Sequence, residues 1–520
     1  MGHERSQSSL PLLPHSSDSP PPTPLFPHRS RGVLLHAHRR RFLVLIFALL
    51  SFIGILTLAA SSFSSLQYVT TERENNTNPP SHTLPHAADN SGVLSTEQHP
   101  AIDTSSHAVS LPHSPYLRGP PTKSFRDNLR SDLKYVTSWI SAGWNNDVMT
   151  YMNLLYMGKI TDRVSVIGIF TPSHIGGDAP PIAFGEVFNV SRFIQDSKVP
   201  MVEWDEVKDP ESEVIDAVGC WNVWEAVQYY EHYPRGSAVP DWVGLDISYT
   251  RGPEWLKLVP NYEHDKCSTF WALARLAYPE DRNKNLGNPT PSHHYNISLP
   301  PDEHLLCYDY LYYACAQQSF EFEYDYAPQW KDVGKYLYWS DVVEQTATSY
   351  VRKLLGVSDL DEKTPPYITV HARHGDFKGW CWEAEKPEDC FAPLPVIARR
   401  VKEVQEEIRT RKGIDIPDAH VIMTSDEKDE AWWAEVKAMG WIRVDHDALD
   451  TVQQHGRWYP VILDAAIQSN GLGFVGTDRS TFSILSMRRV KDWHDGAVRM
   501  VKWGKKDADA HRRRMLVDGV

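Results

Sequence analysis

Strand-like apolar runs alternate with helix-like segments from residue 367 to residue 503. Ile397, Val401, Val404 and Ile408 recur at the 4-3-4 spacing of one helix face. The expected strands are 367–370, 419–423, 441–444 and 473–476, and the expected helices lie at 397–408, at 425–440 beginning with Ser425-Asp426, at 461–468 and from Ser480. This alternation predicts an α/β fold with a parallel sheet and crossover helices.

A charged cluster follows the first of these strands directly. The run Tyr367–Val370 is rich in β-branched residues and leads into His371-x-Arg373-x-x-Asp376. Open α/β sheets bind ligands at the carboxyl ends of their strands. We therefore expect an anion-binding site at this position.

The first half of the chain has a less regular pattern. A helix near Asn145–Lys159 followed by a strand at Val164–Phe170 begins as an α/β unit. The stretch 172–335 is rich in Pro, Trp and Tyr, which indicates insertions and long loops. We expect an N-terminal Rossmann-like domain at 123–345 and a C-terminal one at 346–520.

Residues 42–60 contain no charged side chain and would span about 28 Å as a helix, close to the thickness of a bilayer core. Five arginines precede the run between residues 29 and 41, so the positive-inside rule predicts a cytosolic, disordered tail at 1–41 and a single-pass type II anchor. Residues 61–122, rich in Ser, Thr and Pro, read as a luminal stem. A cleaved signal peptide is the alternative.

The charge distribution and the positions of the cysteines agree with a luminal location of the chain after residue 60. The net charge of −14 includes +4 from the first 41 residues, so the remainder carries −18, which argues against nucleic-acid binding. All six cysteines follow the apolar run, and Cys381 with Cys390 is the disulfide we expect first. Sequons at Asn75, Asn189 and Asn296 also follow it. We expect a membrane glycoprotein of the ER or Golgi.

The order Gly143-Trp144-Asn145-Asn146, His371-x-Arg373, Asp464 and Ser480-Thr481-Phe482 resembles that of the O-fucosyltransferase superfamily. The resemblance runs over roughly residues 135–503 and is tightest from 367 onward. It implies a GT-B architecture, in which two Rossmann-like domains face a cleft, and GDP-fucose as the donor.

The residue types suit a GDP-sugar. Arg373 would neutralise the diphosphate as the glycosidic bond breaks, and Ser480 and Thr481 would meet the phosphates at a helix N-terminus. Asp464 would accept hydrogen bonds from the guanine edge. The remaining expected donor contacts are His371, Phe482, Gly143, Asn145 and Asn146, the last three by resemblance, although this chain has Asp147 where the family often has Gln.

The expected reaction is inverting transfer of fucose to a hydroxyl of a protein or glycan, with no metal or cofactor. Asp147 and Asp376 are candidate bases by position. Plain structural roles compete with each assignment: an Arg373–Asp376 ion pair, a loop-capping Asp464, and Ser480 and Thr481 as helix caps.

Four other functions stay open. They are transfer of another GDP-sugar, a histidine-phosphatase-type hydrolase built on Arg373-His374-Gly375, a metal-dependent transferase using Asp445-His446-Asp447, and a non-catalytic protein that keeps the nucleotide site.

Overall fold

The computed structural model describes residues 114–172, 175–176, 179–358 and 363–510. Residues from 114 onward belong to one compact unit. The expected anchor at 42–60 lies outside the described residues, and no helix within them is both long and apolar enough to cross a bilayer. The expected domain boundary at 345/346 stays a prediction.

The second half is built on a parallel sheet of five strands in the order β11-β10-β9-β12-β13. The chain starts in the centre with β9, winds outward to β11, and returns to the other side of β9 with β12. Ligand crevices of open α/β sheets lie where the winding reverses, here between β9 and β12. The strands are β9 (Ile368–Ala372), β10 (Val421–Ser425), β11 (Ile442–Arg443), β12 (Gly473–Thr477) and β13 (Ala497–Val501).

The first half holds a parallel sheet of six strands in the order β3-β2-β1-β7-β4-β5. Strand β7 comes from the stretch expected to contain insertions and lies between β1 and β4. The strands are β1 (Tyr135–Ser138), β2 (Val164–Ile167), β3 (Met201–Glu203), β4 (Asp216–Asn222), β5 (Leu245–Arg251) and β7 (Leu305–Tyr308), and a separate pair joins β6 (Ser268–Thr269) with β8 (Ala314–Cys315). The α/β class and the parallel sheets predicted from the sequence are confirmed.

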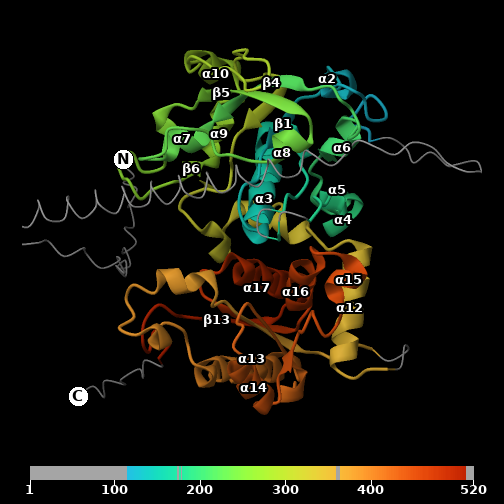
Figure 1. Cartoon of the computed structure of the whole chain (residues 1–520), viewed down its shortest axis with the longest axis vertical. Coiled ribbons are helices and arrows are strands. Elements are labelled where there is room, and N and C mark those ends of the chain that lie inside the picture. The colour runs from blue at the N-terminus through green and yellow to red at the C-terminus, as the bar shows by residue number, and fades with distance from the viewer. Residues whose placement is uncertain (1–113, 173–174, 177–178, 359–362, 511–520) are drawn as a thin grey trace, which may run out of the picture. The chain divides into compact units, whose positions relative to one another are not determined.

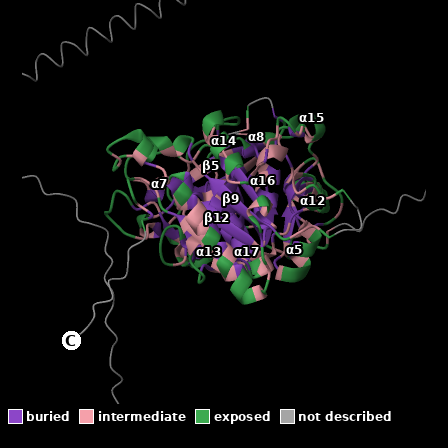
Figure 2. Ribbon diagram, turned by 90° about the horizontal axis from the view of Figure 1, so that it is seen from below, coloured by how far each residue is buried: buried purple, intermediate pink, exposed green. Residues whose placement is uncertain are grey.

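Helices cover both sheets (Figure 1). The long ones are α3 (Trp144–Thr161), α12 (Asp341–Leu354), α13 (Leu394–Lys412), α16 (Tyr459–Ser469) and α17 (Thr481–His494); the shorter ones are α2 (Phe125–Asn128), α4 (Phe184–Val187), α5 (Val190–Ser197), α6 (Trp204–Val207), α7 (Val223–Val227), α8 (Val239–Trp242), α9 (Phe270–Arg275), α10 (Pro279–Lys284), α11 (Pro328–Lys331), α14 (Glu430–Ala438) and α15 (Thr451–His455). The four α13 residues predicted to face the core are all buried. Figure 2 shows β9 and β12 as a buried centre, with exposed residues on the outer elements.

One helix begins later than the sequence suggested. Helix α14 starts at Glu430, and Asp429 caps it by accepting a hydrogen bond from Ala431 N at 2.9 Å. The Ser425 hydroxyl instead donates to Ala372 O at 2.7 Å. Ser425 and Asp426 therefore lie at the end of β10, beside β9, because their side chains bond to the neighbouring strand end instead of capping a helix.

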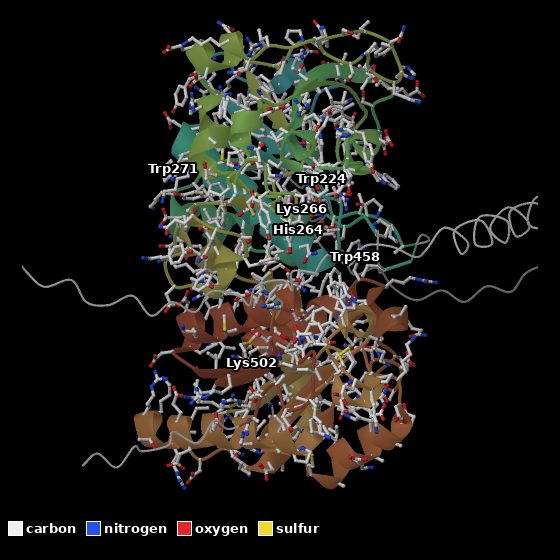
Figure 3. All side chains as sticks on the ribbon, turned by 90° about the vertical axis from the view of Figure 1, so that its left-hand side faces the viewer. Trp224, His264, Lys266, Trp271, Trp458 and Lys502 are labelled. Atoms are coloured by element: carbon white, nitrogen blue, oxygen red, sulfur yellow. A yellow bond between two sulfur atoms is a disulfide. The ribbon has the colours of Figure 1, made fainter. Side chains whose placement is uncertain are left out.

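Aromatic side chains connect the two halves of the compact unit. Trp458 Nε1 donates to Pro180 O at 2.7 Å (Figure 3), and Trp493 Nε1 donates to Lys335 O at 2.8 Å. Trp144, at the start of α3, lies 6.5 Å from the Phe482 ring at the start of α17. This last contact brings the Gly143 loop to the N-terminus of α17.

Two disulfides form within the described chain. Cys381–Cys390, the pair expected first, closes the loop after β9, and Cys220–Cys307 joins β4 to β7. Cys267 and Cys315 are buried thiols. The covalent restraint after β9 matters for the site because it holds the segment that follows Arg373.

Candidate functional site

At the switch point, hydrogen bonds join the end of β9 to the end of β12. Arg373 N donates to Thr477 Oγ1 at 2.9 Å, and the same hydroxyl donates to His371 O at 3.1 Å. His371 Nδ1 lies 2.7 Å from Ser483 Oγ, which also accepts from Thr477 N at 3.0 Å. These bonds fix the ends of both strands against the first turn of α17.

His371 is held as a neutral ring. Burial, with smaller contributions from the positive charges of Arg373 and His374, lowers the pKa of His371 to about 3. Its ring stacks on Phe482 with centroids 4.8 Å apart. The neutral His371 ring therefore adds no positive charge next to Arg373.

Arg373 projects from the end of β9 between two carboxylates. Its guanidinium lies 2.8 Å from Asp376 Oδ1 and 3.0 Å from Asp426 Oδ2, and its side chain is 34% exposed. The Arg373–Asp376 ion pair considered from the sequence is therefore present. Because the guanidinium is shared and partly open to solvent, it can turn to a stronger anion such as a diphosphate.

The N-terminus of α17 meets the crevice from the other side. Ser480 is the buried N-cap residue, and its side chain makes no capping hydrogen bond. The first turn of a helix leaves N–H groups without helical partners and carries a partial positive charge. This first turn lies next to His371, because the ring of Phe482, the second residue of α17, stacks on the His371 ring.

The Gly143 loop begins α3. Asn145 is buried, and the described contacts leave its Oδ1 without a hydrogen-bond partner. Asp147 Oδ1 accepts from Ala142 N at 2.9 Å. Burial raises the pKa of Asp147 to about 8 against the opposing effect of its backbone hydrogen bonds and of Arg235. The Asn145 Oδ1 is itself buried, and the backbone carbonyl of Asn146 accepts from Thr150 Oγ1 at 2.8 Å.

Asp464 lies on α16 and pairs with His446. His446 Nε2 is 3.0 Å from Asp464 Oδ1, and His446 Nδ1 is 3.0 Å from Thr451 Oγ1. Burial alone would lower the pKa of His446, but the hydrogen bond and charge of Asp464 outweigh it and raise the pKa. Asp464 is the residue expected at the guanine edge, and its side chain is 24% exposed.

His374 has a structural environment. Its Nδ1 lies 2.8 Å from Glu427 Oε2, and its ring packs against Phe391 and Trp432. Burial would raise the pKa of Glu427, but bonds from His374 and two backbone N–H groups lower it to about 2. A buried, bonded ring is poorly placed to accept a phosphoryl group, which disfavours the phosphatase alternative.

Sequence reasoning missed Asp426. Besides pairing with Arg373, its Oδ1 accepts from His374 N at 2.8 Å. A side chain on Gly375 would overlap Asp426 Oδ2, so Gly375 provides the space in which the carboxylate sits. The available signal was an acidic residue directly after a buried strand, the same pattern that identified Arg373.

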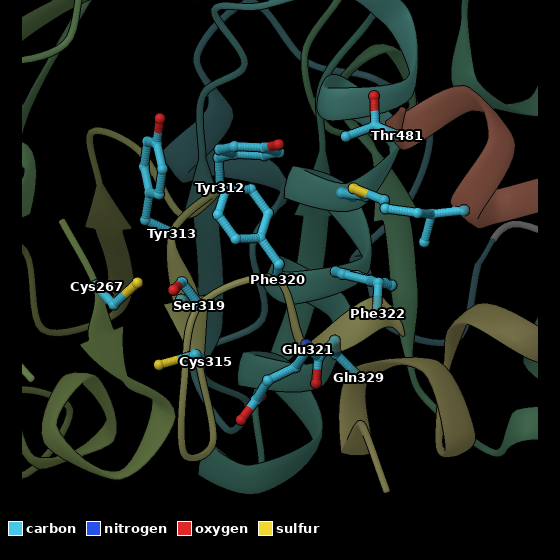
Figure 4. Close-up of a pocket in the computed structure, with 13 residues that line it drawn as sticks. Cys267, Tyr312, Tyr313, Cys315, Ser319, Phe320, Glu321, Phe322, Gln329 and Thr481 are labelled. Atoms are coloured by element: carbon cyan, nitrogen blue, oxygen red, sulfur yellow. The ribbon is translucent and has the colours of Figure 1, made fainter. Parts of the chain in front are cut away.

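Two cavities border these residues. One is lined by Thr481 and by an aromatic wall from the first half that includes Tyr312, Tyr313 and Phe320 (Figure 4). Another borders His371 and Arg373. Within the described residues no group of three or more His, Cys, Asp or Glu side chains could hold a metal ion, the Asp445-His446-Asp447 segment included.

The fold is an α/β fold with two parallel sheets, and a charged cluster lies at the switch point of the second sheet, where folds of this class bind ligands. The family model described as GDP-fucose protein O-fucosyltransferase matches residues 135–491. The chain therefore belongs to this family and is a glycosyltransferase of the fucosyltransferase kind.

Similar solved structures include POFUT1 in complex with GDP-fucose, which is 14% identical, with 71% of this chain and 98% of that chain covered and a TM-score of 0.43. The fucosyltransferase NodZ from Bradyrhizobium is 11% identical, with 68% and 92% covered and a TM-score of 0.33. No curated protein sequence matches the chain significantly.

Proposed function

We propose that this protein transfers fucose from GDP-fucose to a hydroxyl acceptor by an inverting, metal-independent reaction on a GT-B fold. The observation that carries the proposal is Arg373 at the β9–β12 switch point, where its backbone N donates to Thr477 Oγ1 at the end of the strand that precedes α17. Family membership supports GDP-fucose as the donor, and the names of solved structures with GDP-fucose agree with it. The other GDP-sugars remain the competing donors.

Arg373 has the chemistry for the leaving group. As the bond from fucose to the β-phosphate breaks, negative charge grows on the diphosphate, and the Arg373 guanidinium, turning from its two carboxylates, can stabilise that charge with paired hydrogen bonds. The start of α17 supplies a second positive potential, so the proposed reaction needs no cation for charge neutralisation. The acceptor hydroxyl would attack the anomeric carbon from the opposite face.

Of the two candidate bases, Asp376 is the better placed. Its carboxylate is 65% exposed beside Arg373. Asp147 is buried, and its pKa of about 8 means that it keeps its proton at neutral pH. Asp147 would therefore serve as a base only in alkaline solution, and we assign proton removal to Asp376.

We also infer that residues 42–60 anchor the protein in the ER or Golgi membrane, with the catalytic part in the lumen. The Cys220–Cys307 and Cys381–Cys390 disulfides agree with an oxidising compartment. Of the two sequons among the described residues, Asn296 is exposed, whereas the Asn189 side chain caps α5 by accepting from Arg192 N. Glycosylation at Asn296 is therefore the more favourable case.

The test is release of the nucleoside diphosphate by the full-length chain, GDP from GDP-fucose or GDP-mannose and UDP from UDP-galactose, with and without EDTA. We expect release from GDP-fucose alone, unchanged by EDTA. Release that stops with EDTA would contradict metal independence, and preference for GDP-mannose would contradict the donor. If GDP does not raise the melting temperature of the protein, and if the protein releases no GDP from any donor, the proposed function would be contradicted altogether.

A further inference from the structure

Two indole rings stand exposed on the loop that follows Arg373. Trp380 is 59% exposed and Trp382 is 77% exposed, which makes Trp382 the most exposed large hydrophobic side chain of the described residues. Their ring centroids are 5.3 Å apart with a tilt of 41°. Burying a tryptophan is strongly favourable, so two neighbouring indoles left in water indicate a surface with a ligand.

The loop is held rigidly at both of its ends. The Cys381–Cys390 disulfide closes it, and Gly504 N donates to Cys390 O at 2.7 Å. At its start, Phe377 stacks on Trp503 with centroids 4.6 Å apart. Trp382 Nε1 donates to Gly379 O at 2.9 Å, which also fixes the ring. The indoles are therefore presented in a set arrangement, and a ligand would not have to order them.

Carboxylates surround the indoles. Residues 376–390 contain five acidic and two basic side chains, and Asp376, Glu383, Glu385 and Glu388 are all exposed. Glu383 is 72% exposed and pairs with Lys505 at 2.8 Å. A polyanion or an anionic lipid surface would be repelled here. Flat apolar rings next to strong hydrogen-bond acceptors suit a neutral sugar, whose C–H face covers an indole while its hydroxyls donate to carboxylates.

The indoles are also continuous with the site of bond breaking. The 3₁₀-helix η4 (Asp376–Trp380) begins at the partner of Arg373 and ends at the first indole. At a rise of about 2 Å per residue, this helix is roughly 8 Å long. A chain of a few sugar rings bound on the indoles could therefore present a hydroxyl at the donor site.

We propose that Trp380 and Trp382 form an acceptor subsite, and that the acceptor is a neutral saccharide chain. This inference rests on the proposed function and selects a glycan over a peptide as the acceptor. Binding of the saccharide requires the two rings, whereas binding of GDP does not.

The test is isothermal titration of the full-length chain, kept in a non-ionic detergent without a sugar headgroup. The probes are β-1,4-linked hexamers of glucose, mannose, galactose and xylose, a Ser/Thr-rich peptide, and GDP. The variants are Trp380→Ala, Trp382→Ala and, as a matched control, Trp271→Ala, an indole 57% exposed on α9 in the first half (Figure 3).

We expect at least one hexasaccharide to bind, with its Kd about tenfold or more higher in Trp380→Ala and Trp382→Ala and unchanged in Trp271→Ala, while the Kd of GDP stays the same in all variants. Saccharide binding that survives both substitutions, or binding of the peptide alone, would overturn the proposal. So would the absence of binding by every hexasaccharide. Failure of the proposed function would show separately, as loss of GDP binding by the unaltered chain.

Discussion

At the scale of single residues, the site combines one partly exposed charged side chain with two buried titratable side chains that are neutral. Arg373 is partly exposed and shared between Asp376 and Asp426. His371 is kept neutral, and Asp147 is kept protonated, because both are buried. In the proposed reaction, the positive charge available to the diphosphate therefore belongs to Arg373 and to the start of α17.

Asp147 makes stability depend on pH. Its pKa is about 8 in the folded chain and near 3.8 when unfolded, so the folded state binds the proton more tightly and its stability falls as pH rises through this window. Asp147→Asn keeps the acceptor for Ala142 N but has no proton to lose. We expect the variant to gain roughly 2–3 kcal/mol relative to the unaltered protein between pH 6 and pH 8.

Urea unfolding of the full-length chain at several pH values measures this difference. The exposed Asp196→Asn on α5 is the control and should leave the pH dependence as it is. A difference between Asp147→Asn and the unaltered protein that does not grow with pH would contradict a protonated Asp147.

At the scale of elements, the loop after β9 runs from Arg373 in the proposed donor site to Trp380 and Trp382 in the proposed acceptor subsite. The hydrogen bonds of His371, Thr477 and Ser483 tie β9, β12 and α17 into one unit. The loop leaves this unit at Arg373, and Asp426 from β10 holds it from the side. Small changes in the loop should thus alter activity more than stability.

Gly375→Ala tests this coupling. The added Cβ would overlap Asp426 Oδ2 and push the carboxylate away from Arg373, and because the obstacle is a side chain, the fold can yield at little cost. We expect GDP release from GDP-fucose to fall about tenfold or more, with the melting temperature changed by only a few degrees. Gly379→Ala, in the same loop with open space around it, is the control. Equal activity in the two variants would contradict a role for Asp426.

At the scale of the whole molecule, the second half was predictable, whereas in the first half the sequence located α3 and β2 but not the elements after them. The alternation of strand-like and helix-like segments located β9, α13, β10, α16, β12 and α17, because the apolar residues of each element recur at the spacing of a strand or a helix. Strand β7 completes the sheet by pairing with β1 and β4, with Leu305 opposite Tyr135 and Tyr308 opposite Trp221, and local sequence carries no signal for such distant pairing. The position of β7 therefore emerged only from the structure.

The site divides in the same way. His371, Arg373 and Ser480–Phe482 follow strand ends that the pattern reveals, and the structure brings them together. Asp426 was assigned to a helix start because Ser-Asp is a common capping pair, although the true cap is Asp429. Asp464 was expected at the guanine edge; its Oδ1 lies 3.0 Å from His446 Nε2, and the guanine contact stays a prediction. Contacts across the fold decide such roles.

The central part of the proposed function is that Arg373 holds the diphosphate of the donor. Isothermal titration of GDP into the full-length chain tests this directly, with Arg373→Ala compared against Arg443→Ala, a strand-end arginine of the same sheet that is 32% exposed and also ion-paired. We expect the Kd of GDP to rise about tenfold to hundredfold in Arg373→Ala, because charge-assisted hydrogen bonds are lost, and to stay within about twofold in Arg443→Ala. An Arg373→Ala protein that folds and binds GDP as tightly as the unaltered chain would contradict the account.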